Sequence, residues 1–524
     1  MTALINNKFF VIFLAPFLLG GLSILGFAPY NLTFINFLTF SILLSLILLV
    51  RKKTDTKYRK KKSKIYFFYL GCAFGFGFFL FGNYWIAISL THDEMFVNLI
   101  PYTLVLVPLF LSIFYGLTIL IIGPYAEKKM SFILFFSLIF SLFEFLRGNI
   151  LTGFPWNLIS YTWSWSIESI QILSLIGTYS LSTISITFFC IPFLFFQKKI
   201  TRNNITSFIF FLTIFFVNYL YGSYKINNLN YKFDESIKVK IVSPNFSLKD
   251  YSTQSEVTQL KRLIKISNPE KNKKTLFVWP EGVFYESNLQ NVTLYKKLFL
   301  DNFSENHLIA LGINNLIGSD DLDNKKYFNS LAILNHKLEI LSVYNKINLV
   351  PFGEFLPFEF FFSKFGLKKI TSGYNSFSSG DKRRVISLGD KFNEKKILPL
   401  ICYEIIYPSK IKKKNQSPDL VINISEDGWF GESIGPHQHY AKAIYRAVEE
   451  GVFIARSANK GISGFLDPNG RSLKLLNIGE SGNIELNMPK FIGTTAYSLY
   501  GNKIFYLIIF LYMFLILILR KYKI

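Results

Sequence analysis

Long apolar runs are the feature of this chain that most limits its fold. A helix needs roughly 20 apolar residues to cross the hydrocarbon core of a bilayer. Eight runs approach that length: residues 8–27, 32–50, 66–90, 98–123, 131–147, 172–196, 204–222 and 503–520. The first run has no small-residue cleavage site at its end, so we expect a retained helix and not a removed signal peptide. The sequence therefore predicts a multi-span helical membrane bundle.

Basic residues between the runs predict the orientation of the chain. They gather at 51–64, 128–129, 198–202 and 520–523, whereas the loop at 91–97 carries a histidine and two acids. Because Lys and Arg in short loops stay on the cytoplasmic side, both termini are expected in the cytoplasm. Seven spans before residue 223 then place the following domain outside the inner membrane, in the periplasm of a bacterium. Such basic blocks also attract anionic lipids, so the net charge of +23 does not indicate a nucleic-acid partner.

Residues 223–500 have the composition of a soluble domain. Short apolar runs predict strands at 239–242, 276–279, 308–312, 331–334, 397–401 and 420–424, and helices fit 252–267, 290–304 and 436–450. Buried strands separated by helices are typical of an α/β domain. We therefore expect three parts: a bundle of seven spans at 1–222, this domain at 223–500, and a C-terminal membrane helix at 501–524.

The connection at 148–171 is rich in aromatic residues and includes Gly153-Phe154-Pro155-Trp156. Aromatic side chains at membrane–water interfaces commonly form a belt, and this is our interpretation of the segment. The lining of a lipid entry path is the alternative.

Three polar residues follow predicted strands of the α/β domain: Glu281, Lys346 and Cys402. Ligand sites in such folds gather beyond the carboxyl ends of the strands. Each residue alone has an ordinary explanation, since a free Cys is commonly buried in a core and a Lys is usually solvated. Cys402 is the only cysteine of the domain, so a thiol nucleophile is a second interpretation. The three residues together form a candidate catalytic constellation.

The residues around these positions carry a resemblance to known proteins. The motifs are Gly26–Tyr30, Gly153–Trp156, Trp279–Glu281, Lys346–Pro357, Ile401–Glu404, Asp427–Gly431 and Arg456–Ser463. The domain resembles the nitrilase superfamily, and the whole chain is similar to the apolipoprotein N-acyltransferase family. Two positions depart from the family pattern: Ser243 replaces a usual Gln, and Glu426 stands where an Asn is common.

The resemblance implies an αββα sandwich and a two-step acyl transfer without a cofactor. Cys402 would be the nucleophile, Glu281 the general base and Lys346 the oxyanion stabiliser. A membrane phospholipid would donate the acyl group, and a diacylglyceryl apolipoprotein would accept it. We find no Gly-rich phosphate loop in the sequence, so a nucleotide is not expected to take part. Among supporting residues, Glu354 is expected to orient Lys346 or to be a surface carboxylate, and the backbone amides of Tyr403 and Glu404 are candidates for the oxyanion hole.

Two further features have competing interpretations. A Phe-rich stretch follows Lys346 and is either an arm that enters the outer leaflet or a helix packed on the bundle. Its members are Phe355, Leu356, Phe358, Phe360, Phe361, Phe362 and Phe365. His437 and His439 have a metal-ligand spacing, but no third ligand is near in sequence, so no metal site is expected.

Three other functions are weighed against acyl transfer. A membrane-tethered nitrilase-type amidohydrolase would use the same three residues, with water as the second nucleophile. A non-catalytic membrane scaffold would have no use for them. A transporter would need a series of charges deep in the spans. Glu144 and Arg147 lie near the outer end of the fifth span, but the sequence shows no such series.

Overall fold

The computed structural model describes residues 7–54, 60–196, 200–318, 325–357, 360, 376–411 and 416–522. The chain divides into two compact units. The first, the membrane unit, comprises Met1–Ala87, Asn98–Asn228 and Tyr500–Ile524. The second, the catalytic unit, comprises Ile88–Val97 and Leu229–Leu499. Phe358, Phe361, Phe362 and Phe365 of the Phe-rich stretch, and the basic residues Lys57, Arg59, Lys198, Lys199 and Lys523, lie outside the described residues.

The membrane unit is built from apolar helices. Seven helical segments in the described part are long and apolar enough to cross a membrane, and Phe10–Gly26 is a shorter apolar one. The helices are α2 (Ala15–Ser23), α3 (Ile35–Thr54), α4 (Lys60–Asn83), α5 (Trp85–Ile88), α6 (Ile100–Ile122), α7 (Met130–Asn149), α8 (Leu173–Cys190), α9 (Arg202–Asn227) and α16 (Lys503–Lys521). The third expected run continues to residue 90, but α4 ends at Asn83 and a short α5 follows. The protein is therefore a membrane protein with a helical bundle, as the sequence predicts.

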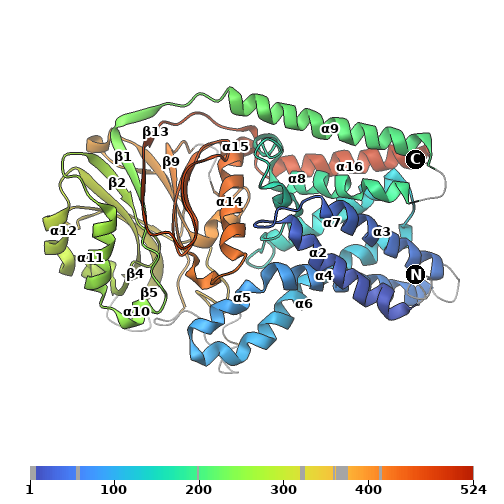
Figure 1. Ribbon diagram of the computed structural model, residues 1–524, viewed down its shortest axis with the longest axis horizontal. Coiled ribbons are helices and arrows are strands. Elements are labelled where there is room, and N and C mark those ends of the chain that lie inside the picture. The colour runs from blue at the N-terminus through green and yellow to red at the C-terminus, as the bar shows by residue number, and fades with distance from the viewer. Residues whose placement is uncertain are drawn as a thin grey trace. The chain divides into compact units, whose positions relative to one another are not determined.

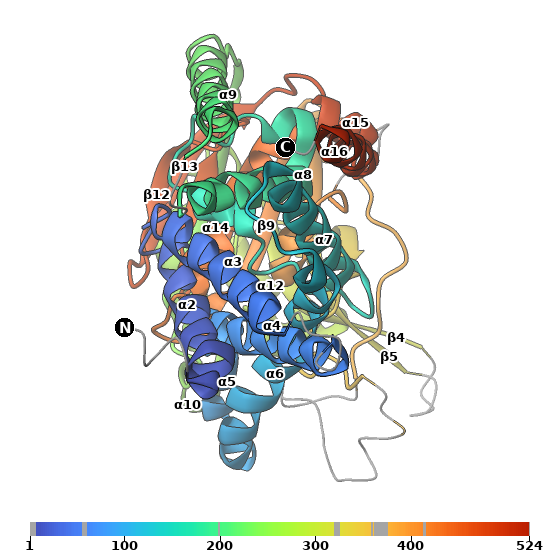
Figure 2. The same cartoon turned by 90° about the vertical axis from the view of Figure 1, so that its right-hand side faces the viewer.

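Helix α9 runs along the outside of the membrane unit (Figures 1 and 2). Only 6% of its apolar window is buried in the unit, compared with 78% for the segment Leu173–Phe195 that contains α8. The C-terminal half of α9 is held to this unit by polar and close backbone contacts. Asn218 Nδ2 donates to the Ser169 carbonyl at 2.9 Å, Lys225 Nζ donates to the Ser174 hydroxyl at 2.8 Å, and Gly222 packs on the carbonyl of Glu168. A Cβ at Gly222 would lie 1.9 Å from that oxygen, so only glycine permits this approach. Most of the α9 surface is consequently free to face lipid.

The aromatic connection after α7 is buried, which makes the interfacial-belt interpretation wrong for its central residues. Trp156 is fully buried and Trp163 is 4% exposed. The irregular backbone here finds its partners on two charged residues of α7. Arg147 donates to the carbonyls of Phe154 and Asn157, and Glu144 accepts from the amide of Ile159 at 3.1 Å. Irregular backbone at membrane depth requires such internal partners.

Two sheets form the centre of the catalytic unit. The first has the order β13-β1-β2-β4-β5-β6, and β3 pairs with β4 beside this path. The second has the order β12-β11-β10-β9-β8-β7. The strands of the first are β1 (Phe233–Ser243), β2 (Lys274–Val278), β3 (Phe284–Asn288), β4 (His307–Ile317), β5 (Lys326–Asn335), β6 (Ile340–Asn345) and β13 (Gly482–Pro489). Those of the second are β7 (Ile386–Ser387), β8 (Lys396–Ile401), β9 (Leu420–Glu426), β10 (Phe453–Asn459), β11 (Ser463–Leu466) and β12 (Ser472–Leu476).

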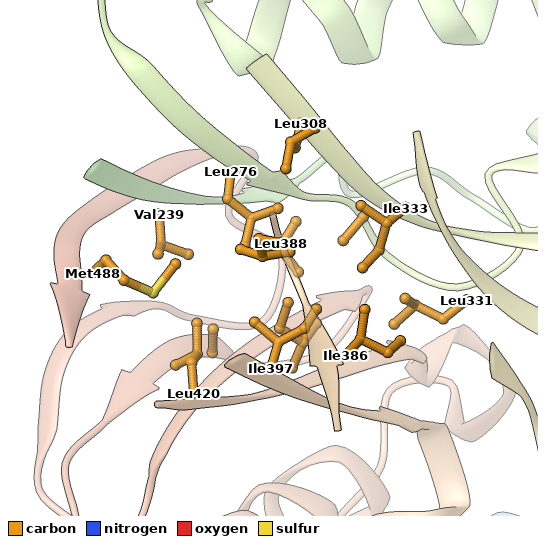
Figure 3. Packing of buried hydrophobic residues seen from close by; sticks show 14 of the residues in the cluster. Val239, Leu276, Leu308, Leu331, Ile333, Ile386, Leu388, Ile397, Leu420 and Met488 are labelled. Carbon is orange, nitrogen blue, oxygen red and sulfur yellow. The ribbon is translucent and has the colours of Figure 1, made fainter. Parts of the chain in front are cut away.

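The two sheets pack face to face through aliphatic side chains. Figure 3 shows Val239, Leu276 and Ile333 of the first sheet against Ile397 and Leu420 of the second. Helices cover the outer faces: α11 (Glu256–Ser267) and α12 (Lys296–Asn302) lie on the first sheet, and α14 (Gly435–Glu450) lies on the second (Figure 1). The result is the αββα sandwich that the family resemblance implies.

Local sequence explains where two predicted helices differ from the structure. The helix expected at 252–267 is divided into α10 (Asp250–Thr253) and α11, because Gln254 is extended and Ser255 caps α11 by accepting from the Thr258 amide. The stretch 290–304 begins as a 3-10 segment, Leu289–Tyr295, before α12. The last helix of the unit, α14, has Pro436 in its first turn, as expected. A short α15 (Ala496–Tyr500) precedes α16.

Candidate active site

Strand direction brings the three candidate residues together at one edge of the sandwich. β1, β2 and β4 are parallel, and β6 runs in the same direction because two antiparallel pairings separate it from β4. Glu281 therefore follows the carboxyl end of β2, and Lys346 follows that of β6. Cys402 follows β8, which is parallel to β9 in the other sheet. The charges of Glu281 and Lys346 both act on the Cys402 thiol, so the three side chains share one site.

Lys346 is a buried cation between two carboxylates. Its Nζ lies 2.9 Å from Glu354 Oε1 and 3.4 Å from Glu281 Oε1, and its side chain is 1% exposed. Burial opposes the charged form, but the two carboxylates outweigh it and hold the pKa of Lys346 well above its usual range. The Lys346 backbone is fixed as well, since its amide donates to the Asn329 carbonyl and its carbonyl accepts from the Gly380 amide. The site thus contains a permanent, immobile positive charge.

Glu281 is held by three donors. Its Oε1 accepts from Asn329 Nδ2 at 2.6 Å and from Lys346, and its Oε2 accepts from the Glu426 amide at 3.0 Å. Asn329 Nδ2 also donates to Glu354 Oε1 at 2.7 Å, so it bridges the two carboxylates. Glu354 is 6% exposed and accepts from the Val350 amide at 2.8 Å, so it is not the surface carboxylate of the alternative interpretation.

Cys402 begins a 3-10 turn, Cys402–Ile406, in an uncommon backbone conformation. Its φ of 49° lies in the left-handed region, which costs a non-glycine residue free energy. A sharp turn of this kind lifts a nucleophile from the end of its strand. Burial raises the pKa of the Cys402 thiol, Glu281 raises it further, and Lys346 opposes them. The resting group is therefore a thiol that needs a base before it can attack.

The side chain of Glu404 has a structural role that is separate from the one expected of its backbone amide. Its carboxylate is fully buried and accepts from Arg383 Nη2 at 2.6 Å, from the Ile347 amide at 2.9 Å and from the Ile401 amide at 2.9 Å. Burial opposes ionisation, but Arg383 and these amides lower the pKa of Glu404. The side chain thereby joins the segment after Lys346 to the turn at Cys402. Tyr403 is 7% exposed and stacks edge-on against Tyr407.

Asn329, Arg383 and the Glu426 amide are the site contacts that the sequence does not reveal. Asn329 is one polar residue on an alternating strand, and Arg383 stands in a basic run that looks solvated. Glu426, one of the two departures from the family pattern, ends β9 and is 6% exposed. Its carboxylate accepts from Asn459 Nδ2, the Gly428 amide and the Tyr251 hydroxyl. The other departure, Ser243, donates its hydroxyl to the carbonyls of Ala458 and Glu480.

A buried polar cluster lies behind the turn that follows Glu426. Asp427 accepts from Arg456 Nη2 at 2.7 Å, and His439 Nδ1 lies 3.0 Å from its other oxygen. Burial lowers the pKa of His439 to about 4, so its ring is neutral at neutral pH. His439 thus belongs to this cluster, and His437 is half-buried on the same helix. Across the described ranges, three or more His, Cys, Asp or Glu side chains do not gather into a metal-binding group.

Comparison with known proteins defines first a class and then a family. The carbon-nitrogen hydrolase family matches residues 251–485, and the apolipoprotein N-acyltransferase N-terminal domain matches residues 19–191. The chain is therefore an enzyme that joins a carbon-nitrogen hydrolase domain to a helical membrane bundle. The apolipoprotein N-acyltransferase of Rickettsia prowazekii is 35% identical over 498 residues, which are 93% of this chain and 94% of the relative. The chain belongs to the apolipoprotein N-acyltransferase family.

Other relatives give the same result. The apolipoprotein N-acyltransferase of Rhodopseudomonas palustris is 29% identical over 523 residues, 96% of this chain and 94% of the relative. That of Brucella melitensis is 29% identical over 490 residues, 91% of this chain and 89% of the relative. Among solved structures, the nitrilase-superfamily protein Nit3 of Saccharomyces cerevisiae aligns with 49% of this chain and 91% of its own at 18% identity and a TM-score of 0.35.

Proposed function

We propose that this enzyme moves an acyl group from a membrane phospholipid to the α-amine of an S-diacylglyceryl cysteine at the N-terminus of an apolipoprotein. The similarity to apolipoprotein N-acyltransferases supports the class of acceptor. One observation supports the chemistry most strongly. The buried Lys346 cation lies beside Glu281, at the edge of the sandwich where Cys402 follows its strand. A thiol, a base and a fixed positive charge are what acyl transfer through a thioester requires.

The first half-reaction forms the thioester. Glu281 takes the proton of the Cys402 thiol as Sγ attacks an ester carbonyl of the phospholipid. The tetrahedral oxyanion forms next to Lys346, whose charge is already in place and needs no reorganisation. When the intermediate collapses, the C–O bond breaks and the leaving alkoxide takes the proton from Glu281. The products are a lysophospholipid and an acyl group on Cys402.

The second half-reaction makes the amide. The α-amine of the acceptor attacks the thioester carbonyl and Glu281 takes the proton that the amine loses. The oxyanion forms again beside Lys346, and its collapse breaks the C–S bond. The Cys402 thiolate recovers the proton from Glu281, so the enzyme returns to its starting state. The acyl activation is stored in the thioester, and the cycle balances without ATP.

Glu354 and Glu404 support this chemistry from outside the reacting atoms. Glu354 binds Lys346 more closely than Glu281 does, so it anchors the cation. Glu404 ties the Lys346 segment to the Cys402 turn. For Tyr403 and Glu404, a contribution of the backbone amides to the oxyanion hole is part of the proposal, because both directly follow the nucleophile.

The proposed location is the bacterial inner membrane. The basic loops support cytoplasmic termini, with a seven-span bundle at 1–222 and a final membrane helix at 501–524. Residues 223–500 would then act in the periplasm. Both lipid substrates would reach the enzyme from the membrane.

The test is intact-mass spectrometry of the purified protein after incubation with phospholipid vesicles, with wild type beside Cys402→Ala. We expect an acyl adduct on wild type alone that hydroxylamine removes. Absence of the adduct with a reactive Cys402 would favour the amidohydrolase, and absence with an inert Cys402 would favour the scaffold. A diacylglyceryl peptide added to the acylated enzyme should then discharge the thioester and gain the acyl mass.

A further inference from the structure

The segment Ile88–Val97 packs with the catalytic unit, although in sequence it connects α5 to α6. Its His92 ring meets the Trp429 ring edge to face, with centroids 5.5 Å apart. Its Ile88 packs on Gly431, where a Cβ would lie 2.7 Å from Ile88 Cγ2. These contacts all fall on one short feature, the 3-10 turn Asp427–Phe430 and the glycine that ends it.

That turn is directly connected to the proposed base. The His92 ring hydrogen-bonds the backbone of Gly428, and the Gly428 amide donates to Glu426 Oε1 at 2.9 Å. The Glu426 amide in turn donates to Glu281 Oε2 at 3.0 Å. The contacts therefore run without interruption from His92 through the turn to Glu281. On the other side the turn is fixed by the Asp427–Arg456 ion pair.

We propose that His92 and Trp429 are positioning residues for Glu281. The contact between their rings holds the Asp427–Phe430 turn in place. It thereby fixes the Glu426 amide, which orients the Glu281 carboxylate. The proposal rests on the proposed function, because it assigns these residues a task in the acyl transfer that Glu281 would catalyse. Neither residue touches the reacting atoms.

The physical reason is the sensitivity of a base to its orientation. Asn329 and Lys346 both bind Glu281 Oε1, so the Glu426 amide is the hydrogen-bond partner that orients Oε2. A turn that tilts would lengthen this bond and leave the carboxylate free to rotate. Small displacements of a catalytic group lower rates by one to two orders of magnitude.

The experiment compares His92→Ala, His92→Phe, Trp429→Ala, Trp429→Phe and the double alanine variant in the full-length enzyme. The rate of thioester formation on Cys402 is measured over a range of concentrations of a soluble short-chain ester, and thermal unfolding is measured alongside. His437→Ala is the matched control, since His437 is a half-buried histidine of the same unit outside this chain of contacts. The groups that face Glu281, namely Lys346, Cys402, Glu426 and Tyr251, stay in place in every variant.

We expect each alanine variant to lower the maximal rate of thioester formation by roughly tenfold, with little change in the ester concentration that gives half of that rate. The double variant should be no worse than either single one, and the phenylalanine variants should retain most activity. Alanine variants that match His437→Ala, or losses that only follow the unfolded fraction, would overturn the inference. A wild type without an acyl adduct would instead overturn the proposed function.

Discussion

Glu144 of the membrane unit and Glu281 of the catalytic unit are both buried carboxylates that accept hydrogen bonds from their neighbours, yet their surroundings differ. Glu144 accepts from the Ser182 hydroxyl and the Ile159 amide, and its cation Arg147 lies 3.9 Å away. Arg147 is itself occupied by carbonyls of the aromatic connection. The cation near Glu281 is instead shared with a second carboxylate, and a thiol stands beside it.

The comparison shows how a buried carboxylate that holds the structure together differs from one that can act as a base. Around Glu144, every strong contact goes to a backbone group or hydroxyl of a segment that must be held in place. Around Glu281, Glu354 draws the Lys346 cation toward itself, since its distance is 2.9 Å against 3.4 Å for Glu281. This leaves Glu281 able to accept a proton while the positive charge stays where an oxyanion would form.

The same substitution in both carboxylates should give opposite results. Glu281→Gln removes the proposed base, so thioester formation should fall by about a thousandfold while the melting temperature changes little. Glu144→Gln leaves Arg147 without its counter-charge, so it should destabilise the membrane unit by about 3 kcal/mol and leave the rate per folded enzyme unchanged. Intact-mass kinetics and thermal unfolding measure the two effects. A stable, inactive Glu144→Gln protein would break the comparison.

Glu354→Gln probes the anchor of the cation. The amide keeps the size of the side chain but removes the charge that holds Lys346, so Lys346 should move toward Glu281 and away from its place beside the oxyanion. We expect roughly a tenfold loss in the rate of thioester formation, consistent with one weakened electrostatic contact at an oxyanion site. Glu305→Gln, in an exposed ion pair with Lys391, is the control. An unchanged rate would mean that Glu281 holds Lys346 alone.

Glu426 sharpens the comparison, because its partners Tyr251, Asn459 and Gly428 carry no charge. Burial raises the pKa of Glu426 to about 8, and Glu281 adds to this. A carboxyl with a raised folded pKa contributes stability below its unfolded value, and that contribution is lost as pH rises through about 8. The wild-type melting temperature should therefore fall between pH 5 and pH 8, and Glu426→Gln should flatten the slope.

The slope is measured by thermal unfolding at several pH values in that interval. Exposed Glu235→Gln should keep the wild-type slope. If the melting temperatures of wild type and Glu426→Gln change with pH in the same way, Glu426 is ionised throughout this interval. Its uncharged hydrogen-bond donors would then be sufficient to stabilise the carboxylate.

Much of the fold could be predicted because its signals are periodic or long. The apolar runs predict the membrane helices. The runs at 397–401 and 420–424 lie on β8 and β9, and the run at 276–279 extends one residue beyond the end of β2. The pairing of β1 with β13 could not be predicted, since it joins residues that are far apart in sequence and have no shared pattern. The burial of Trp156 could not be predicted either. The segment that contains Trp156 is held by contacts from Glu144 and Arg147 to an irregular backbone, and such contacts leave no pattern in the sequence.

The candidate site divides in the same way. Glu281, Lys346 and Cys402 could be proposed as site residues because each follows a recognisable strand and belongs to a specific motif. Asn329 and Arg383 could not, since a single polar residue on a strand or in a basic run gives no signal of its own. The contacts of Ile88–Val97 were equally hidden, because a loop between two membrane helices is expected to belong with those helices.

The division of the triad between two sheets has a consequence for the hydrophobic layer that separates them. Glu281 and Lys346 follow strands of one sheet, and Cys402 follows a strand of the other. The distance between nucleophile and base therefore depends on the thickness of the aliphatic packing in Figure 3 as well as on the hydrogen bonds of Glu404 and the Glu426 amide across the site. That packing fixes the separation of the two sheets, and so helps to fix the separation of the groups that react. A methyl group gained or lost there would change the reacting distance, even at positions that never meet a substrate.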